Sequence, residues 1–265
     1  LHIDNLSEER AHDEEDIQRL LLSKDELKAF EKQQKKEAKE EAKKKKSDEA
    51  DKKNKLFLLD FKGDVDASQV ETFREEISTV LTMAKEQDEV LVRLESPGGV
   101  VHGYGLAASQ LDRLRQAGIK TTVAVDKVAA SGGYMMACVA DTIIAAPFAI
   151  IGSIGVVAEL PNINRLLKRF DVDIEQHTAG NFKRTLTVLG KNTEEGRQKF
   201  KQELAETHQL FKSFVAEHRD TVDIEAVSTG EHWYGTQAKD LNLVDKIQTS
   251  DDFVLAALKE YDVFK

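Results

Sequence analysis

The chain has 265 residues, and 40% of them are hydrophobic, so it can bury one sizeable core. Its formal net charge of −10 disfavours nucleic acid as a general partner, because an acidic surface repels phosphate backbones. A single cysteine, Cys138, excludes an intrachain disulfide, and its apolar neighbours predict a buried thiol. No apolar run reaches the roughly 18 residues that a membrane-spanning helix needs. Because the chain begins with Leu1, we expect a processed or truncated protein whose anchor, if it has one, lies upstream.

The first 54 residues are rich in Glu, Lys, Asp and Gln, unlike the rest of the chain. Their few apolar residues are spaced for one short amphipathic helix over about 14–31. Residues 31–55 have almost nothing to bury, which predicts a solvated helix or a flexible linker. The Lys-rich stretch 35–46 is either a soluble spacer or a juxtamembrane segment attracted to anionic lipid. We therefore predict a charged N-terminal arm, residues 1–54, before a second domain, residues 55–265.

From residue 55 onward, predicted strands and helices alternate, which indicates an α/β fold with parallel strands and right-handed crossovers. The short apolar or alternating runs that predict strands are 56–61, 89–95, 121–126, 142–146, 173–177 and a stretch near 243–247. The segments with helical spacing are 69–85, 102–117, a helix that begins at 131, 162–169 and 194–217.

Two glycine-containing loops follow predicted strands, at the edge where open α/β sheets place their ligands. The first is Ser96-Pro97-Gly98-Gly99, and the second is Ser131-Gly132-Gly133 at the start of a helix. Acyl transfer requires a hydroxyl that attacks a carbonyl and N–H donors that hold the oxyanion. We interpret Ser131 as the nucleophile, with the amides of Gly98 and Gly132 as oxyanion donors. The alternative is an ordinary helix cap followed by packing glycines.

A serine nucleophile needs a base, and the histidines do not supply an obvious one. His102 and His177 are the two that could reach the site. His208 and His218 are predicted to be exposed on the long helix, and His232 to pack beside Trp233. A lysine can act as the base only when it is neutral, which requires burial or a neighbouring cation. Nothing in the residues alone singles out one lysine from the others.

A resemblance to a known family identifies the residue that is expected to serve as the base. Several ordered blocks resemble those of the signal peptide peptidase A family of serine peptidases, S49-type, over roughly residues 55–250. The blocks are VRLESPGG (92–99), VDKVAASGGYMMA (125–137), APFAIIGSIGVV (146–157) and FKRTLT (182–187).

The resemblance implies a ClpP/crotonase-like fold of stacked βαβ units and a Ser–Lys dyad formed by Ser131 and Lys183. It also implies that Ser153 orients the lysine amine. Short members of the family complete the dyad across a subunit interface in some cases, so we expect a homo-oligomer. The expected substrates are peptides, such as signal-peptide remnants or other envelope peptides, and no cofactor or metal is expected. The sequence contains no HExxH motif and no Cys/His cluster.

The resemblance further implies a bacterial inner-membrane location through an anchor outside this chain. The family favours the periplasmic side, whereas a Lys-rich stretch after an anchor favours the cytoplasmic side. Two other functions are compatible with this fold class. One is a crotonase-type acyl-CoA enzyme, which would use carboxylates and leave the Ser131–Lys183 pair unexplained. The other is a non-catalytic, membrane-associated oligomeric scaffold.

Overall fold

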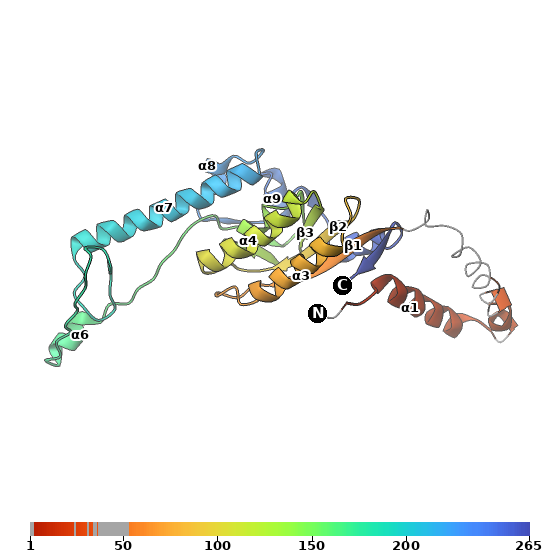
Figure 1. The fold of residues 1–265 in the computed structure, drawn as a ribbon, viewed down its shortest axis with the longest axis horizontal. Coiled ribbons are helices and arrows are strands. Elements are labelled where there is room, and N and C mark those ends of the chain that lie inside the picture. The colour runs from red at the N-terminus through yellow and green to blue at the C-terminus, as the bar shows by residue number, and fades with distance from the viewer. Residues whose placement is uncertain (1–2, 24, 31, 34–35, 37–52) are drawn as a thin grey trace.

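The computed structural model describes residues 3–23, 25–30, 32–33, 36 and 53–265 (Figure 1). Its centre is a six-stranded sheet in the order β8-β5-β3-β2-β1-β9, and every neighbouring pair is parallel. This sheet confirms the predicted α/β class. Its strands are β1 (Asn54–Lys62), β2 (Glu89–Glu95), β3 (Lys120–Val125), β5 (Thr142–Ala145), β8 (Lys246–Ile247) and β9 (Tyr261–Phe264).

A second, three-stranded sheet lies beyond the carboxyl ends of the main strands. It consists of β4 (Val128–Ala130), β6 (Ile150–Gly152) and β7 (His232–Tyr234). Strand β4 pairs with β6 in parallel, and β7 pairs with β6 in the antiparallel sense. The sequence indicated only a turn between strand 121–126 and the following helix. The pattern hides β4 because three residues are too few to show an alternation.

Both faces of the main sheet are covered, which explains its continuous apolar strands. Helices α3 (Val70–Met83) and α4 (Val101–Gln116) pack on one face, and Figure 1 shows them side by side. Helix α10 (Ser250–Ala257) contributes Ala257 to the smaller core on the other face. Burying each large apolar side chain of these layers stabilises the fold by about 1.5–3 kcal/mol. The core side of α3 consists of Val70, Phe73, Ile77 and Val80.

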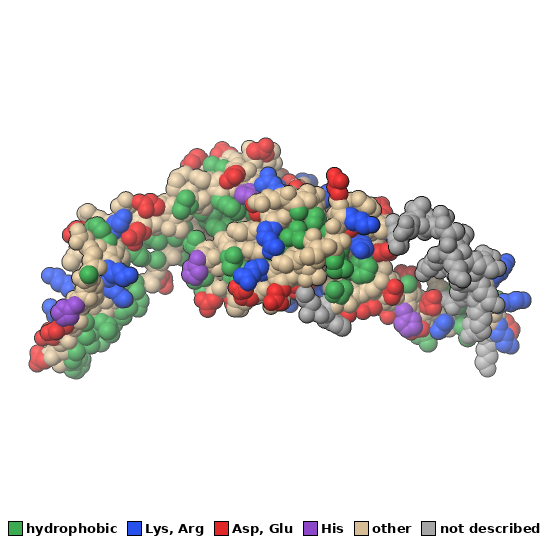
Figure 2. Space-filling view, viewed as in Figure 1, with side chains coloured by type: hydrophobic (Ala, Val, Ile, Leu, Met, Phe, Trp, Pro, Cys, Tyr) green, Lys and Arg blue, Asp and Glu red, His purple; other side chains and the backbone are tan. Residues whose placement is uncertain are grey.

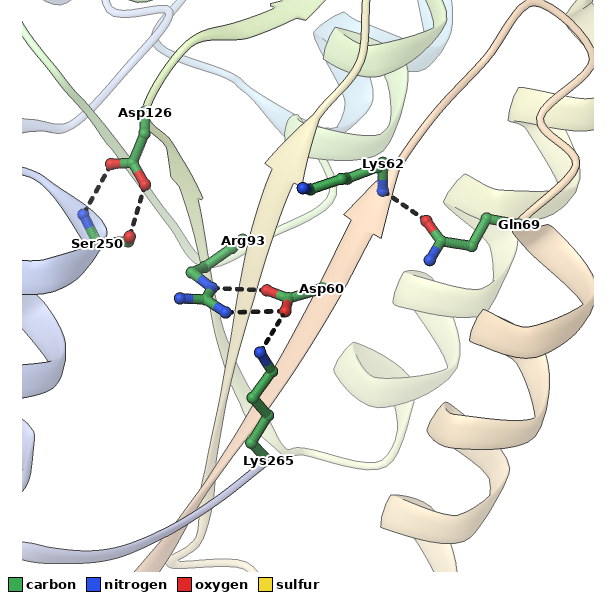
Figure 3. Close-up of polar contacts among 7 residues, drawn as sticks. All are labelled: Asp60, Lys62, Gln69, Arg93, Asp126, Ser250 and Lys265. Carbon is green, nitrogen blue, oxygen red and sulfur yellow. Dashed lines mark hydrogen bonds and ion pairs between the residues drawn. The ribbon is translucent and has the colours of Figure 1, made fainter. Parts of the chain in front are cut away.

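The carboxyl end of β1 carries an ion-pair network on the α10 side of the sheet (Figure 3). Arg93 donates from Nε and Nη2 to the Asp60 carboxylate at 2.6 and 2.8 Å, and Lys265 Nζ lies 2.9 Å from the same group. Burial raises the pKa of Asp60, but the hydrogen bonds from Arg93 and Lys265 outweigh it and hold that pKa below its ordinary value. Nearby, Asp126 accepts bonds from the Ser250 backbone N–H and hydroxyl and so fixes the start of α10.

An extension leaves the compact part of the molecule between β6 and the long helix α7 (Glu194–His218). We call residues 157–193 the α6 extension, after the helix α6 (Asn164–Arg169) that it contains. Figure 1 shows it projecting away from the sheet. The predicted strand over 173–177 is wrong, since these residues are exposed and irregular. Their alternating pattern finds no neighbouring strand to complete a hydrogen-bonded ladder.

Two further short helices complete the carboxyl-terminal part. They are α8 (Ile224–Val227) and α9 (Gly235–Asp240).

The N-terminal helix differs from the predicted one. Helix α1 (Leu6–Leu21) is capped by the Asn5 side chain and buries none of its described residues, and a separate helical segment covers 25–30. The single helix predicted over 14–31 is therefore wrong. Ser23 starts the second segment, because its backbone N–H and hydroxyl both bond the Glu26 carboxylate. Most of the predicted linker over 31–55 lies outside the described residues. In the described ranges, every helix is too short or too polar to cross a membrane.

Candidate active site

Ser131 lies at a sharp turn between β4 and helix α5 (Gly132–Ala137). Its φ of 51° and ψ of −119° are unusual for a residue with a Cβ. Such strain persists only where the surrounding structure imposes it, and it is concentrated at functional sites. The Ser131 N–H donates to Gly152 O at 2.8 Å, while its side chain makes no capping bond to α5. The hydroxyl is therefore not used as the helix cap that was its alternative interpretation.

The two glycine loops meet at this serine. A Cβ built on Gly98, whose φ is +88°, would lie 2.7 Å from each of Ser131 Cβ, Ala130 O and Gly132 N. A Cβ on Gly132 would lie 2.3 Å from the Tyr104 ring. Both positions thus require glycine because the backbones and the ring approach too closely for a side chain. The close approach places two backbone segments beside the nucleophile, as an oxyanion site needs.

A cavity of about 560 Å³ opens over Ser131. Ser131, Gly98, Gly132 and Ser153, four of the five residues selected from the sequence, all line it. Ser153 also has a positive φ, 54°, and its N–H donates to Glu231 O at 2.7 Å. The two serines thus face one cavity from two strained turns, each following a strand of the three-stranded sheet.

Lys183 is the fifth selected residue, and it does not line this cavity. It is exposed, in the α6 extension between α6 and α7, and its backbone N–H donates to Gly180 O at 3.2 Å. The structure therefore does not bring Ser131 and Lys183 together within one chain.

The two histidines that the sequence left as possible bases, His102 and His177, do not line this cavity either. His102 is exposed and does not line the cavity, and the exposed His177 lies 3.6 Å from the carboxylate of Glu175. The predicted exposure of His218 is wrong, since its side chain is only 6% exposed and packs on the Phe214 ring. Its Nδ1 lies 2.8 Å from Phe214 O.

His208 is the cavity residue that the sequence interpretation missed. It was predicted to be exposed, but it is half-buried and lines the cavity. Its Nε2 is buried and has no hydrogen-bond partner in the described part of the chain. Its spacing from Phe211 and Val215, both buried, places all three on the core-facing side of α7, and this periodicity was the available signal. Of the described side chains around the cavity, only that of His208 is ionisable.

The chemistry of the cavity is that of a hydroxyl with backbone donors. Among the described residues, no three His, Cys, Asp or Glu side chains gather as metal ligands would. The apolar residues that line the cavity form a surface, called here the apolar cavity wall, that can accept an aliphatic side chain. Its members are Met135, Val156, Val157 and Phe211.

Comparison with known proteins now identifies the family. Residues 113–263 match peptidase family S49, and residues 1–111 match the N-terminal region of the same family. The chain belongs to peptidase family S49. The predicted resemblance and the ClpP-like α/β fold are thereby confirmed.

Individual relatives agree with this family. The chain is 65% identical over 213 residues to the "Probable protease SohB" of Haemophilus influenzae, covering 80% of this chain and 60% of the relative. It is 63% identical over 213 residues to the "Probable protease SohB" of Buchnera aphidicola subsp. Acyrthosiphon pisum, covering 80% of this chain and 63% of the relative. The chain therefore spans about three fifths of the length of these curated relatives.

Proposed function

We propose that this chain is the catalytic part of a serine endopeptidase that works through an acyl-enzyme. The observation that carries the proposal is Ser131, held in a strained turn with its hydroxyl unused by the helix, in a cavity beside two glycine loops. Membership of peptidase family S49 supports it.

In the proposed mechanism, the neutral amine of Lys183 takes the proton of Ser131 Oγ as this oxygen attacks the scissile carbonyl carbon. The carbonyl oxygen becomes an oxyanion held by backbone N–H groups. The tetrahedral intermediate then expels the amine of the leaving peptide, which takes up the proton from Lys183. Water, deprotonated by the same lysine, then attacks the acyl carbon, and Ser131 Oγ leaves with the proton that the lysine returns to it. Ser153 is proposed to hydrogen-bond the lysine amine and orient it.

Gly132 and Gly98 are the proposed oxyanion donors. Gly132 is the first residue of α5, where the helix itself offers its N–H no acceptor. The Gly98 N–H donates to Ser96 Oγ at 3.1 Å in this structure, so its proposed role requires this N–H to be shared with or transferred to the oxyanion during the reaction.

We further propose that Lys183 reaches Ser131 of a neighbouring copy in a homo-oligomer. The cavity around Ser131 is lined by no lysine of the described chain, while Lys183 is exposed on a segment that projects from the sheet. Figure 2 shows hydrophobic side chains gathered at the end of the molecule where that segment lies. An exposed apolar surface of this kind is typical of an interface. Its members include Leu160, Ile163, Leu166, Phe170 and Phe182.

A mixing experiment tests the dyad and its arrangement together. Ser131→Ala and Lys183→Ala are each expected to be inactive on fluorogenic peptides, because either change removes one half of the dyad. Co-refolded mixtures of the two variants should regain activity, since a copy with intact Ser131 then adjoins a copy with intact Lys183.

Full activity of Lys183→Ala would refute the lysine as base and direct attention to His208. Inactive mixtures of variants that form the wild-type oligomer would refute the dyad between subunits. If a fluorophosphonate fails to label Ser131 in the wild-type oligomer, the proposed peptidase function is refuted. That result would favour the alternative function, a non-catalytic oligomeric scaffold.

The substrates are proposed to be membrane-associated or envelope peptides, including signal-peptide remnants, with small or aliphatic residues before the cleaved bond. The apolar cavity wall supports the second part. A panel of peptides that differ only at this residue tests this preference, and faster cleavage after charged residues would contradict it.

The proposed location is the bacterial inner membrane, to which a segment outside this chain would anchor the protein. Carbonate extraction of the full-length protein from membranes, followed by protease treatment of spheroplasts, tests the location and the side.

A further inference from the structure

A buried polar network lies directly beneath the loop that faces Ser131. Ser96 and Tyr104 are both fully buried, and their hydroxyl oxygens lie 2.5 Å apart. Tyr104 Oη also lies 2.7 Å from Asp64 O, and the Gly98 N–H donates to Ser96 Oγ. Buried polar groups are costly unless they are paired, and this network pairs each of its hydroxyls.

The direction of these bonds follows from their chemistry. Asp64 O is a carbonyl oxygen and only accepts, so the Tyr104 hydroxyl hydrogen points to it. The Ser96 hydroxyl must then donate to Tyr104 Oη, which leaves the lone pairs of Ser96 Oγ to accept the Gly98 N–H. The bonds therefore form one directed chain from the Gly98 amide to Asp64, and bonds in such a chain polarise one another.

The Tyr104 ring also contacts the second loop. A Cβ on Gly132 would lie 2.3 to 2.8 Å from the Cγ, Cδ2 and Cβ atoms of Tyr104. A Cβ on Gly63 would lie 2.3 Å from Tyr104 Oη and 2.5 Å from Ser96 Oγ, so the backbone at Gly63 also packs tightly over the two hydroxyls. One side chain thus supports both backbone segments that flank Ser131, through its hydroxyl on one side and its ring on the other.

We propose that Tyr104 is a positioning residue that, through Ser96, fixes the Gly98 peptide beside Ser131 and so sets the rate of acylation. The proposal rests on the peptidase function proposed above. Tyr104 does not touch the substrate, because it is fully buried and does not line the cavity. Its loss should therefore lower kcat and leave KM nearly unchanged.

Tyr104→Phe is the direct test, because it keeps the ring against Gly132 and removes only the hydroxyl. Misplacing a catalytic group by about 1 Å, or losing one oxyanion donor, costs on the order of 100-fold, so a loosened loop should lower kcat by about 10- to 100-fold. Ser96→Ala should have a similar effect. The double variant should be no slower than the slower single one, because both changes break the same chain of bonds.

Tyr134→Phe provides a matched control. Tyr134 is also fully buried and its hydroxyl also donates to a backbone carbonyl, Leu243 O at 2.9 Å, but it is not linked to Gly98. It should lose comparable stability without the loss in kcat. The rate of fluorophosphonate labelling at Ser131 gives a second readout, since the phosphonyl oxygen occupies the oxyanion site, and it should fall in parallel with kcat.

Amide hydrogen exchange at Gly98, measured in the Ser131→Ala background, reports on the network without any catalysis. The Gly98 amide should be protected when Tyr104 is present and exchange at least tenfold faster in Tyr104→Phe. An unchanged or increased labelling rate in Tyr104→Phe, or unchanged exchange at Gly98, would overturn the proposal. A wild-type oligomer that does not label at all refutes the peptidase instead, and the exchange measurement still decides whether Tyr104 fixes the loop.

Discussion

The ion pair between Arg219 and Asp245 allows an asymmetric stability prediction. Arg219 caps the carboxyl end of α7, and its guanidinium donates to the two Asp245 oxygens at 3.0 and 2.8 Å. The Arg219 side chain is 7% exposed, whereas that of Asp245 is 38% exposed. Neutralising the aspartate therefore leaves a buried cation unpaired, while removing the arginine leaves a carboxylate that water can reach.

Removing one partner of a buried ion pair costs about 3–5 kcal/mol. Arg219 keeps one bond, from Nη2 to Asn242 O at 2.9 Å, and Asp245 is partly solvated, so we expect about 2–3 kcal/mol for Asp245→Asn. Asp245 Oδ2 accepts a hydrogen bond from the Ile143 N–H at 2.7 Å, and the side-chain oxygen of the asparagine can still accept it. Arg219→Met keeps most of the apolar stem and should cost only about 1 kcal/mol.

Urea unfolding at pH 7, followed by circular dichroism at one protein concentration, measures both changes. The double variant Arg219→Met/Asp245→Asn should resemble Arg219→Met alone, because no buried charge is left unpaired. If Arg219→Met destabilises the protein as much as Asp245→Asn does, the reasoning from burial is wrong.

Three other predictions follow from single positions. Gly133→Ala should lower the free energy of unfolding by about 1–3 kcal/mol, because its Cβ would lie 2.5 Å from Ser96 O. The control Gly105→Ala in α4 would place a Cβ that meets nothing within 4 Å, so it should be neutral or stabilising. Thermal unfolding of both variants measures the difference. The lowered pKa of Asp60 means that its stabilising contribution is complete above about pH 4, the unfolded-state pKa, and is lost as pH falls through the folded-state pKa. The stability difference between wild type and Asp60→Asn should therefore shrink below pH 4, and a constant difference in acid unfolding curves would contradict this. Burial raises the pKa of Cys138 far above its ordinary value, so a thiol reagent should modify it only after denaturation, and rapid reaction of the native protein would show that the core opens.

The main strands were predictable because their signal is local. Parallel strands that are buried on both faces are rich in consecutive apolar residues, and VLV (90–92) and VAV (123–125) are the apolar centres of β2 and β3. The long helix α7 was predictable from its spacing and its Thr193 cap. The predicted strand over 173–177 failed because a strand needs a partner, and no pattern within one segment shows whether a partner lies beside it.

Ser131 and its glycine loops could be selected from the sequence because the loops come directly after predicted strands. Their motifs also match those of a known family. The role of Tyr104 could not be inferred in this way, since its apolar-spaced position in α4 looks like any core residue. His208 was wrongly predicted to be exposed, because a polar residue on a mostly charged helix is usually expected to face solvent. Lys183 could be named by resemblance, but its place relative to Ser131 could not.

The sequence by itself determined the fold class, the family and the choice of Ser131, Gly98 and Gly132 as candidate site residues, because these depend on local patterns and on motif identity. Only the tertiary structure decided that the Gly98 loop, the turn at Ser131 and the wall of α7 form one cavity while Lys183 lies outside it. The physical reason is that cavities, buried hydrogen-bond chains and the reach of an extension depend on how distant segments pack against one another.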